Sequence, residues 1–242
     1  MNGHAIVVGA SSGIGEAIAR ALRERGAKVS GLARRACRAV DASFACDAAT
    51  PELDVGIARA SELFGPPRFL VYAAGLAAMG KTLDVPADAA RASFEVNFWG
   101  LDRAVRAVLP GMRARGDGAI VAVLSLAALR AIPHEAYYAA AKAAAARYLD
   151  TLALEAAPDG VAVRYVCPGF IDTGFLEKSA WFGMSPPRVR GSGVTPDDVA
   201  RTVVAMLERR RAGRVLGWRE RAIALGDRLA PGLYDALLKR RR

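Results

Sequence analysis

The amino-acid sequence predicts an α/β fold of the Rossmann type, a doubly wound parallel sheet of about seven strands with helices on both faces. Short runs rich in apolar and β-branched residues alternate along the chain with longer segments of helical periodicity. The runs are apolar throughout, which is typical of parallel strands covered on both sides. With 242 residues, 53% of them hydrophobic, and no long polar linker, the chain favours a single large domain.

The expected elements follow one another in the order that this fold requires. A strand at 5–8 leads through a glycine-rich turn at 9–15 into a helix at about 16–25. Thr195 and Pro196 have the pattern of an N-cap and a first helical residue. The other expected elements are strands at 28–33, 44–46, 69–73, 119–124, 161–166 and 214–216, and helices at 52–64, 87–115, 137–156 and 199–209.

Tyr138 and Lys142 lie four residues apart, so they share one face of a helix. A phenol with its ordinary pKa near ~10 is a poor acid or base at neutral pH, but a neighbouring ammonium stabilises its ionised form. Ser125, thirteen residues upstream, could hydrogen-bond the substrate oxygen that gives or takes the proton. The three residues predict a proton-transfer site, whereas the pair alone would also fit an exposed helix surface.

Gly9, Gly13 and Gly15 lie between the first strand and the first helix. Free N–H groups at a helix start, together with absent β-carbons, allow the pyrophosphate of a dinucleotide to approach closely. The spacing Gly-x-x-x-Gly-x-Gly departs from the general fingerprint, so the position after the first strand carries most of this prediction. A purely structural glycine turn is the alternative.

Other kinds of site have little support in the sequence. The three cysteines are widely spaced without a Cys-x-x-Cys pair, which argues against a disulfide framework or a zinc site. His4 and His134 are the only histidines and neither is near an acidic cluster, so we expect no metal centre and no Ser-His-Asp triad. The apolar run at 5–8 is too short for a signal peptide or a membrane span, and we expect a cytoplasmic protein.

Several separate motifs occur in the order found in the short-chain dehydrogenase/reductase family, which the chain resembles from about residue 4 to 217. Weak motifs that recur in the right order reinforce one another. We therefore divide the chain into a dehydrogenase/reductase domain at 1–217 and a C-terminal extension at 218–242. The motifs are Gly9-x-x-x-Gly13-Ile14-Gly15, Asn97, Ser125, Tyr138-x-x-x-Lys142 and Pro168-Gly169.

The resemblance implies a catalytic role for four residues. Tyr138 would be the acid or base for a carbonyl or alcohol, and Ser125 would orient the substrate oxygen. Lys142 would lower the pKa of Tyr138 and hydrogen-bond the nicotinamide ribose. Asn97 corresponds to the family asparagine that kinks its helix and holds a water in a proton relay with the lysine. Tyr137 lacks a lysine four residues on, so we expect it to pack or to line the pocket.

The resemblance also implies how a nicotinamide cofactor would bind. Ile171 and Thr173, in the loop after the strand at 161–166, are the expected contacts of the nicotinamide amide and phosphate, and Asp47 is the expected partner of the adenine amino group. The small residues around Gly75 would let the cofactor lie close. The full set of expected contacts is Gly9, Ser11, Ser12, Gly13, Ile14, Gly15, Arg34, Arg35, Asp47, Ala74, Gly75, Tyr138, Lys142, Pro168, Gly169, Ile171 and Thr173.

The end of the second predicted strand bears on the choice between NAD and NADP. A carboxylate there would bind the ribose 2′-hydroxyl of NAD, whereas an arginine can pair with a 2′-phosphate. Ala33 stands where the acid is expected, and Arg34 and Arg35 follow it. We predict NADP(H), with Arg34 the first candidate and Arg35 the second; a pair of arginines that serves solubility is the alternative. Ser12 weighs slightly against NADP(H), because many NADP-binding relatives carry a basic residue there.

Two positions depart from the family pattern. Val8 replaces the threonine that usually precedes the first glycine, and Tyr72-Ala73-Ala74-Gly75 replaces an Asn-Asn-Ala-Gly segment. In the family, the asparagine that is absent here ties the central strand to its neighbours. Its loss therefore affects a structural hydrogen bond and no group that takes part in the reaction. We expect catalysis to be preserved.

The segment at 175–193 occupies the position of a mobile substrate lid. Its aromatic and aliphatic residues would suit an apolar substrate; the alternative is that these side chains pack against one another within the lid.

Residues 209–242 hold eleven basic against three acidic residues, a net +8 of the total +10. This amphipathic tail would lie on an anionic membrane or pack on a partner subunit or the lid. No basic platform interleaved with aromatic residues appears in the domain, which argues against nucleic-acid binding.

The leading interpretation is an NADPH-dependent reductase of a small-molecule ketone or aldehyde, including hydrophobic, lipid-like or 3-oxoacyl substrates, with the alcohol as product. Two alternatives are a non-catalytic NADP(H)-binding regulatory protein and a peripheral-membrane reductase that handles lipids. The intact set of four catalytic candidates argues against the first alternative. By resemblance to relatives, the helices at 87–115 and 137–156 would form the contacts of a homodimer or homotetramer.

Overall fold

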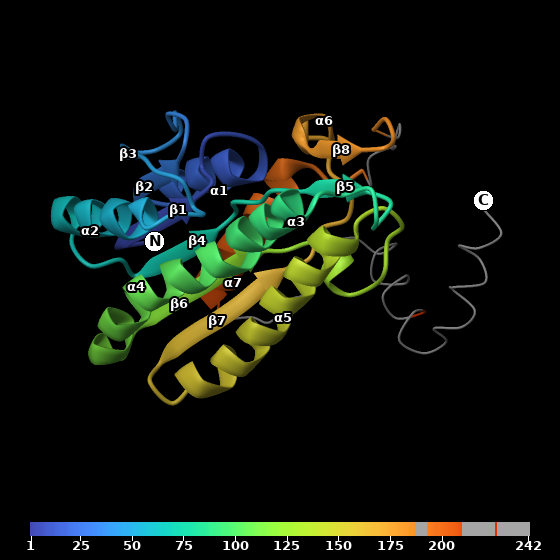
Figure 1. Ribbon diagram of the computed structural model, residues 1–242. Helices are drawn as coiled ribbons and strands as arrows, with labels where there is room; N and C mark the ends of the chain where they lie inside the picture. The colour runs from blue at the N-terminus through green and yellow to red at the C-terminus, as the bar shows by residue number, and fades with distance from the viewer. Residues whose placement is uncertain (187–192, 210–225, 227–242) are drawn as a thin grey trace.

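A six-stranded parallel sheet with helices on both sides forms the centre of the protein (Figure 1). The computed structural model describes residues 1–186, 193–209 and 226. The predicted doubly wound fold is confirmed, with the strand order β3-β2-β1-β4-β6-β7. The seventh predicted strand, at 214–216, lies outside the described residues, and so does the basic C-terminal extension at 218–242 apart from Gly226. The strands are β1 (His4–Val8), β2 (Lys28–Ala33), β3 (Ala42–Ala45), β4 (Phe69–Tyr72), β6 (Gly118–Val123) and β7 (Val161–Val166).

Two layers of helices enclose this sheet (Figure 1). One face carries α1 (Gly13–Glu24) and α7 (Pro196–Arg209), and the other carries α2 (Glu52–Phe64), α4 (Gly100–Arg115) and α5 (Ala136–Ala156). Successive strand residues face opposite layers: Ile6 belongs to the core cluster under α2, α4 and α5, whereas Val7 belongs to the cluster under α1 and α7. Both strand faces are thus buried, which explains the uninterrupted apolar runs.

The carboxyl ends of β1 and β4 meet where the chain connections diverge. β1 pairs with β2 on one side and with β4 on the other, and a crevice for a ligand forms at such a switch point. Gly9 directly follows β1 with φ of +89°, and a Cβ there would lie 2.5 Å from the backbone nitrogen of Ala74. Glycine therefore permits both the turn and the close approach of the two strand ends.

Two parts of the fold differ from the sequence prediction. β3 begins at Ala42 instead of residue 44, because Ala42 and Ser43 already pair with the edge of β2. A separate ribbon pairs β5 (Ala78–Gly80) with β8 (Ala180–Phe182) and joins the segment after β4 to the lid. Its three-residue strands are too short to produce a recognisable period in the sequence. The short helix α6 (Phe175–Lys178) precedes β8.

The long helical stretch predicted at 87–115 contains an irregular turn. It consists of α3 (Ala87–Phe94), the π-helical turn η1 (Glu95–Trp99) and α4. At the end of η1 the N–H of Gly100 donates to the carbonyl of Glu95, five residues earlier. Such a turn inserts one extra residue and is frequent at functional sites. The helix irregularity expected at Asn97 is therefore present.

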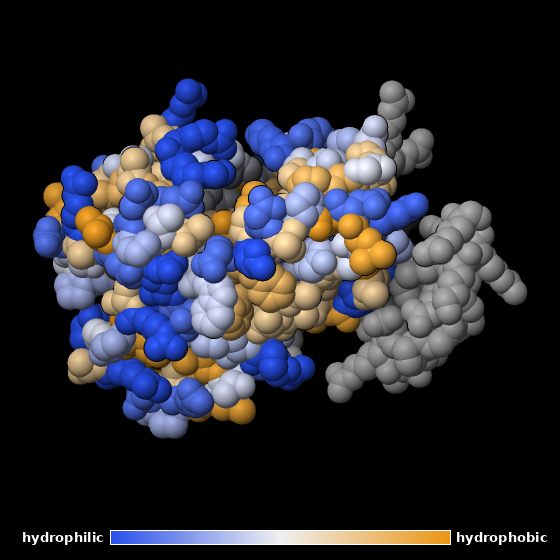
Figure 2. Space-filling model, in the orientation of Figure 1, coloured by the Kyte–Doolittle hydropathy of each residue, from blue (hydrophilic) through white to orange (hydrophobic). Residues whose placement is uncertain are grey.

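The outer surfaces of α4 and α5 mix polar and apolar residues, as the face seen in Figure 2 shows. Trp99, at the junction with α4, is 48% exposed and Leu154 on α5 is 78% exposed. The use of these helices as subunit contacts stays a prediction.

Gly9→Ala tests the close approach of β1 and β4. Gly65→Ala is the matched control, because Gly65 also has a positive φ, of +81°, but nothing lies within 4 Å of its added Cβ. We expect the control to lose about 1 to 3 kcal/mol of unfolding free energy from backbone strain alone. Gly9→Ala should lose roughly 1 to 3 kcal/mol more from overlap with β4. Urea unfolding measures both, and equal losses would contradict the close approach.

Candidate functional site

A cavity of about 830 Å³ opens at the carboxyl ends of the strands. It receives residues from the glycine turn, the ends of β2 and β4, the segment after β6, α5 and the lid. Of the predicted site residues, only Asn97 is absent from its lining. The predicted residues that line it are Gly9, Ser11, Ser12, Gly13, Ile14, Gly15, Arg34, Arg35, Asp47, Ala74, Gly75, Ser125, Tyr138, Lys142, Pro168, Gly169, Ile171 and Thr173.

The glycine turn forms one end of this cavity. α1 begins at Gly13, and its N-cap residue Ser12 makes no side-chain capping bond, so no side chain from that cap takes the first N–H groups of the helix. A Cβ on Gly13 would lie 3.2 Å from the Cβ of Thr173. The turn and the loop after β7 thus face each other across a narrow gap, as the prediction for a phosphate-binding turn requires.

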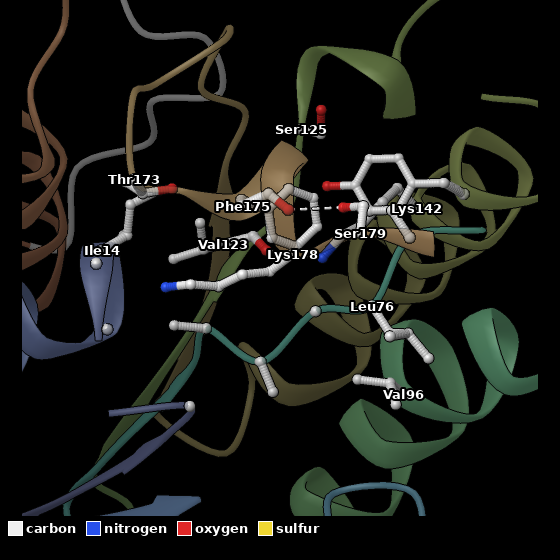
Figure 3. A pocket seen from close by; sticks show the side chains of 18 of the residues that line it. Ile14, Leu76, Val96, Val123, Ser125, Lys142, Thr173, Phe175, Lys178 and Ser179 are labelled. Atoms are coloured by element: carbon white, nitrogen blue, oxygen red, sulfur yellow. Dashed lines mark hydrogen bonds between the residues drawn. The ribbon is translucent and has the colours of Figure 1, made fainter. Parts of the chain in front are cut away.

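Ser125 and Lys142 lie at the other end of the cavity (Figure 3). Tyr138 lines the same part of it, next to both residues. Ser125 follows β6, and its Oγ accepts the N–H of Ala127 at 3.2 Å. Tyr138 and Lys142 lie on the first turns of α5, both buried, with Nζ 5.7 Å from the centre of the phenol ring. Nζ donates to the carbonyl of Val123 at 3.1 Å. The surface-helix alternative is therefore wrong for this pair.

The pKa values differ from the expectation that Lys142 lowers the pKa of Tyr138. Burial raises the pKa of Tyr138 above its usual value, the charge of Glu135 adds to this, and the hydrogen bond with Ser125 only partly offsets it. Burial also lowers the pKa of Lys142 to about 8. Desolvation outweighs the local partners for both groups. Tyr138 is therefore protonated at neutral pH, which is the form that a proton donor needs.

Asn97 lies directly behind this pair. Its Nδ2 donates to the carbonyls of Leu76 at 2.6 Å and Ser93 at 2.8 Å. Its Oδ1 is buried and has no hydrogen-bond partner among the described residues. That oxygen lies 3.3 Å, and Lys142 Nζ lies 3.8 Å, from the position that a Cβ on Gly75 would occupy. The amide oxygen and the ammonium therefore approach the same small space, which suits the predicted relay.

The residues after β2 and β3 line the part of the cavity beyond the glycine turn. Arg34 is exposed and follows β2 directly. The guanidinium of Arg35 instead donates to Ser12 Oγ at 3.2 Å. Asp47 accepts the N–H of Ala49 at 2.9 Å and stabilises its own loop. The order of the two arginine candidates stays a prediction.

The lid brings side chains that the sequence interpretation did not single out. Lys178 extends into the cavity from α6 toward the side of Ile14, and Ser179 Oγ donates to the carbonyl of Phe175 at 2.7 Å (Figure 3). The ring of Phe175 lies 5.9 Å from that of Tyr138. The described part of the lid therefore packs its own side chains and lines the site at once.

Glu135 is a further lining residue that sequence reasoning missed. It lies one helical turn before Tyr138, at the N-cap of α5, and burial raises its pKa to about 7. The spacing of three residues from Tyr138 was the available signal, because residues three apart share a helix face.

Several other features have structural explanations. His4 contacts the Gly65 carbonyl and the Ser30 hydroxyl, and burial lowers its pKa. Within the described residues, no group of three or more His, Cys, Asp and Glu side chains could hold a metal ion. No helix in that part of the chain is both long and apolar enough to cross a membrane.

Comparisons with known proteins agree with this geometry. Residues 3–181 match the family model described as short chain dehydrogenase. A putative ketoacyl reductase of Streptomyces coelicolor is 34% identical over 184 residues, which cover 70% of each chain. A short-chain dehydrogenase from Streptomyces avermitilis has a TM-score of 0.86 at 29% identity, covering 100% of this chain and 98% of the other. One from Burkholderia cenocepacia, in complex with NADP, has a TM-score of 0.81 at 30% identity, covering 98% and 97%.

Glu135→Gln tests the burial of this carboxyl group through pH. A pKa raised to about 7 means that Glu135 favours the folded state fully below its unfolded pKa of about 4.3 and loses this contribution as pH rises through about 7. A glutamine at this position cannot ionise. As pH increases from about 4 to 8, the melting temperature of the variant should therefore rise relative to that of the native protein. Thermal unfolding across that range measures this, and a constant difference would contradict it.

Proposed function

The chain belongs to the short-chain dehydrogenase/reductase family, and we propose that it is an NADP(H)-dependent reductase of a ketone or aldehyde. One observation carries the proposal: a single cavity joins the glycine turn to Tyr138, Lys142 and Ser125. A dinucleotide needs a phosphate-binding turn and a reaction centre that are separated along one crevice. The glycine turn and the group around Tyr138 lie at two ends of this cavity and support the proposal.

The residues of the cavity fit a nicotinamide dinucleotide. Gly9, Gly13 and Gly15 lack the β-carbons that would keep a pyrophosphate away from the turn. Thr173 faces Gly13 from the opposite loop. Lys142 and Tyr138 would hold the nicotinamide ribose, with Ile171 beside the ring. The cofactor, when bound, supplies the hydride that reduces the carbonyl carbon.

Ser125 and Tyr138 would act on the substrate oxygen. The Ser125 hydroxyl would hold the carbonyl oxygen, and the Tyr138 phenol would donate its proton as negative charge develops there. Burial keeps the phenol protonated. Lys142 would then stabilise the phenolate that remains, and Asn97 would help to return a proton to it.

Arg34 supports the choice of NADP(H). It follows β2 without an acid before it, at the place where a 2′-phosphate would lie. The relative from Burkholderia cenocepacia was solved with NADP, which agrees with this choice.

The lid supports a hydrophobic substrate. Phe175, Leu176 and Trp181 cluster with Met79 and Tyr138 above the reaction centre. An acyl chain would match these side chains better than a charged group would. The similarity to a putative ketoacyl reductase makes 3-oxoacyl thioesters the first class to assay. Any use of the basic tail at a membrane rests on sequence alone.

Tyr138→Phe tests the proton donor. We expect turnover to fall by about 10² to 10⁴-fold, whereas NADPH binding should change little. Tyr137→Phe is the matched control, since Tyr137 donates to the Thr82 carbonyl at 3.4 Å, outside the cavity lining. NADPH oxidation is measured with small ketones, aldehydes and 3-oxoacyl thioesters. Full activity of Tyr138→Phe would refute its role, and NADPH binding without turnover of any carbonyl class would favour a regulatory protein.

Arg34→Ala tests cofactor choice. Loss of a charge-assisted pair with a phosphate should raise KM for NADPH about ten- to a hundredfold and leave KM for NADH nearly unchanged. Arg35→Ala is the control and should have a smaller effect, because Arg35 is engaged with Ser12. Equal use of NADH and NADPH by the native protein would overturn the role of Arg34.

A further inference from the structure

The side chain of Tyr72 reaches from the sheet to the helical segment that holds Asn97. Tyr72 ends β4, is 1% exposed and points into the core between the sheet and α4. Its hydroxyl donates to the carbonyl of Val96 at 2.5 Å. Val96 belongs to the π-helical turn and directly precedes Asn97.

The π-helical turn takes the α-helical donor away from this carbonyl. In an α-helix the N–H of Gly100 would donate to Val96, four residues earlier. Here that N–H donates to Glu95 instead. The phenol of Tyr72 therefore supplies the Val96 carbonyl with a donor where the helical pattern is broken. Burial raises the pKa of Tyr72, so the phenol keeps its proton.

Gly100 makes this contact possible. A Cβ on Gly100 would overlap the Tyr72 hydroxyl and the carbonyl oxygen of Ala48. The backbone dihedrals of Gly100 are those of an ordinary right-handed helix, so glycine is needed here for space and not for conformation. Tyr72 and Gly100 thus form a complementary pair between β4 and the helix.

A second contact ties the same two segments together. The Asn97 amide donates to the carbonyl of Leu76, and the Ser93 hydroxyl donates to that carbonyl at 3.1 Å. Tyr72 and Leu76 lie on either side of Ala74 and Gly75, which line the cavity. The segment at 72–76 is therefore fastened to the helix at both of its ends.

We propose that Tyr72 is a positioning residue for the reaction: by holding the Val96 carbonyl it fixes the π-helical turn and so keeps Asn97 Oδ1 beside Lys142. This rests on the proposed function, because it assigns Asn97 and Lys142 to the proton path. Tyr72 touches none of the reacting groups and acts through Asn97.

Tyr72→Phe removes the hydroxyl and leaves the ring in the core. We expect kcat to fall between about ten- and a hundredfold, as for a small displacement of a catalytic group, with the Kd for NADPH unchanged. Tyr165→Phe is the matched control, because it removes another buried phenol hydroxyl, one that donates to Asp150 at 3.2 Å outside the cavity lining. The control should keep kcat.

The double variant Tyr72→Phe with Asn97→Ala separates positioning from a general loss of stability. If Tyr72 acts through Asn97, its substitution should change the single-turnover rate less than about twofold once Asn97 is gone. The same fold loss in both backgrounds, or no loss in the single variant, would overturn the proposal.

Hydrogen–deuterium exchange provides a readout that does not depend on activity. Tyr72→Phe should increase exchange in the peptide that covers 93–101 more than Tyr165→Phe does. Equal exchange in the two variants would overturn the proposal. If the native protein reduces no carbonyl, the proposed function fails, and the exchange measurement still decides whether the Tyr72 hydroxyl holds the turn.

Discussion

The burial of Tyr138 and Lys142 side by side, where β4 and β6 end, is the constraint on which the rest of the site depends. An ammonium is costly in such a place unless its protons find acceptors. The Val123 carbonyl accepts one, and the Asn97 amide oxygen approaches the same space. The end of β6 therefore supplies the acceptor for the Lys142 ammonium, whereas Asn97 Oδ1 lies near the same space without a hydrogen-bond partner among the described residues.

The ends of the strands and the turns that follow them position the other residues of the cavity. Close approach of Gly9 to Ala74 brings the glycine turn and the end of β4 together. The π-helical turn rotates Asn97 toward Gly75, and the loop after β7 returns Thr173 to the glycine turn. Together these contacts bring the proposed phosphate-binding turn and the proposed proton-transfer residues to one cavity, as a dinucleotide-dependent oxidoreductase requires.

The order of elements and most of the site could be predicted from the sequence, because apolar runs, glycine turns and the Tyr138–Lys142 spacing are local patterns. The ribbon of β5 and β8, the lining role of Glu135 and the contact between Tyr72 and Val96 could not be predicted, since each depends on residues brought together by the fold. The raised pKa of Tyr138 was also missed, because the sequence reveals the neighbouring lysine but not the degree of burial.

We propose that the hydride of the nicotinamide and the proton of Tyr138 both reach the carbonyl group at the Tyr138 end of this cavity, while the glycine turn holds the pyrophosphate at the other end. The most direct measurement follows deuterium from C4 of labelled NADPH into the alcohol by mass spectrometry, with a ketone or 3-oxoacyl thioester as substrate. We predict that one deuterium moves to the carbinol carbon and that no deuterium from heavy water enters that carbon. A carbinol hydrogen that comes from the solvent, or no alcohol from any carbonyl class, would contradict the claim.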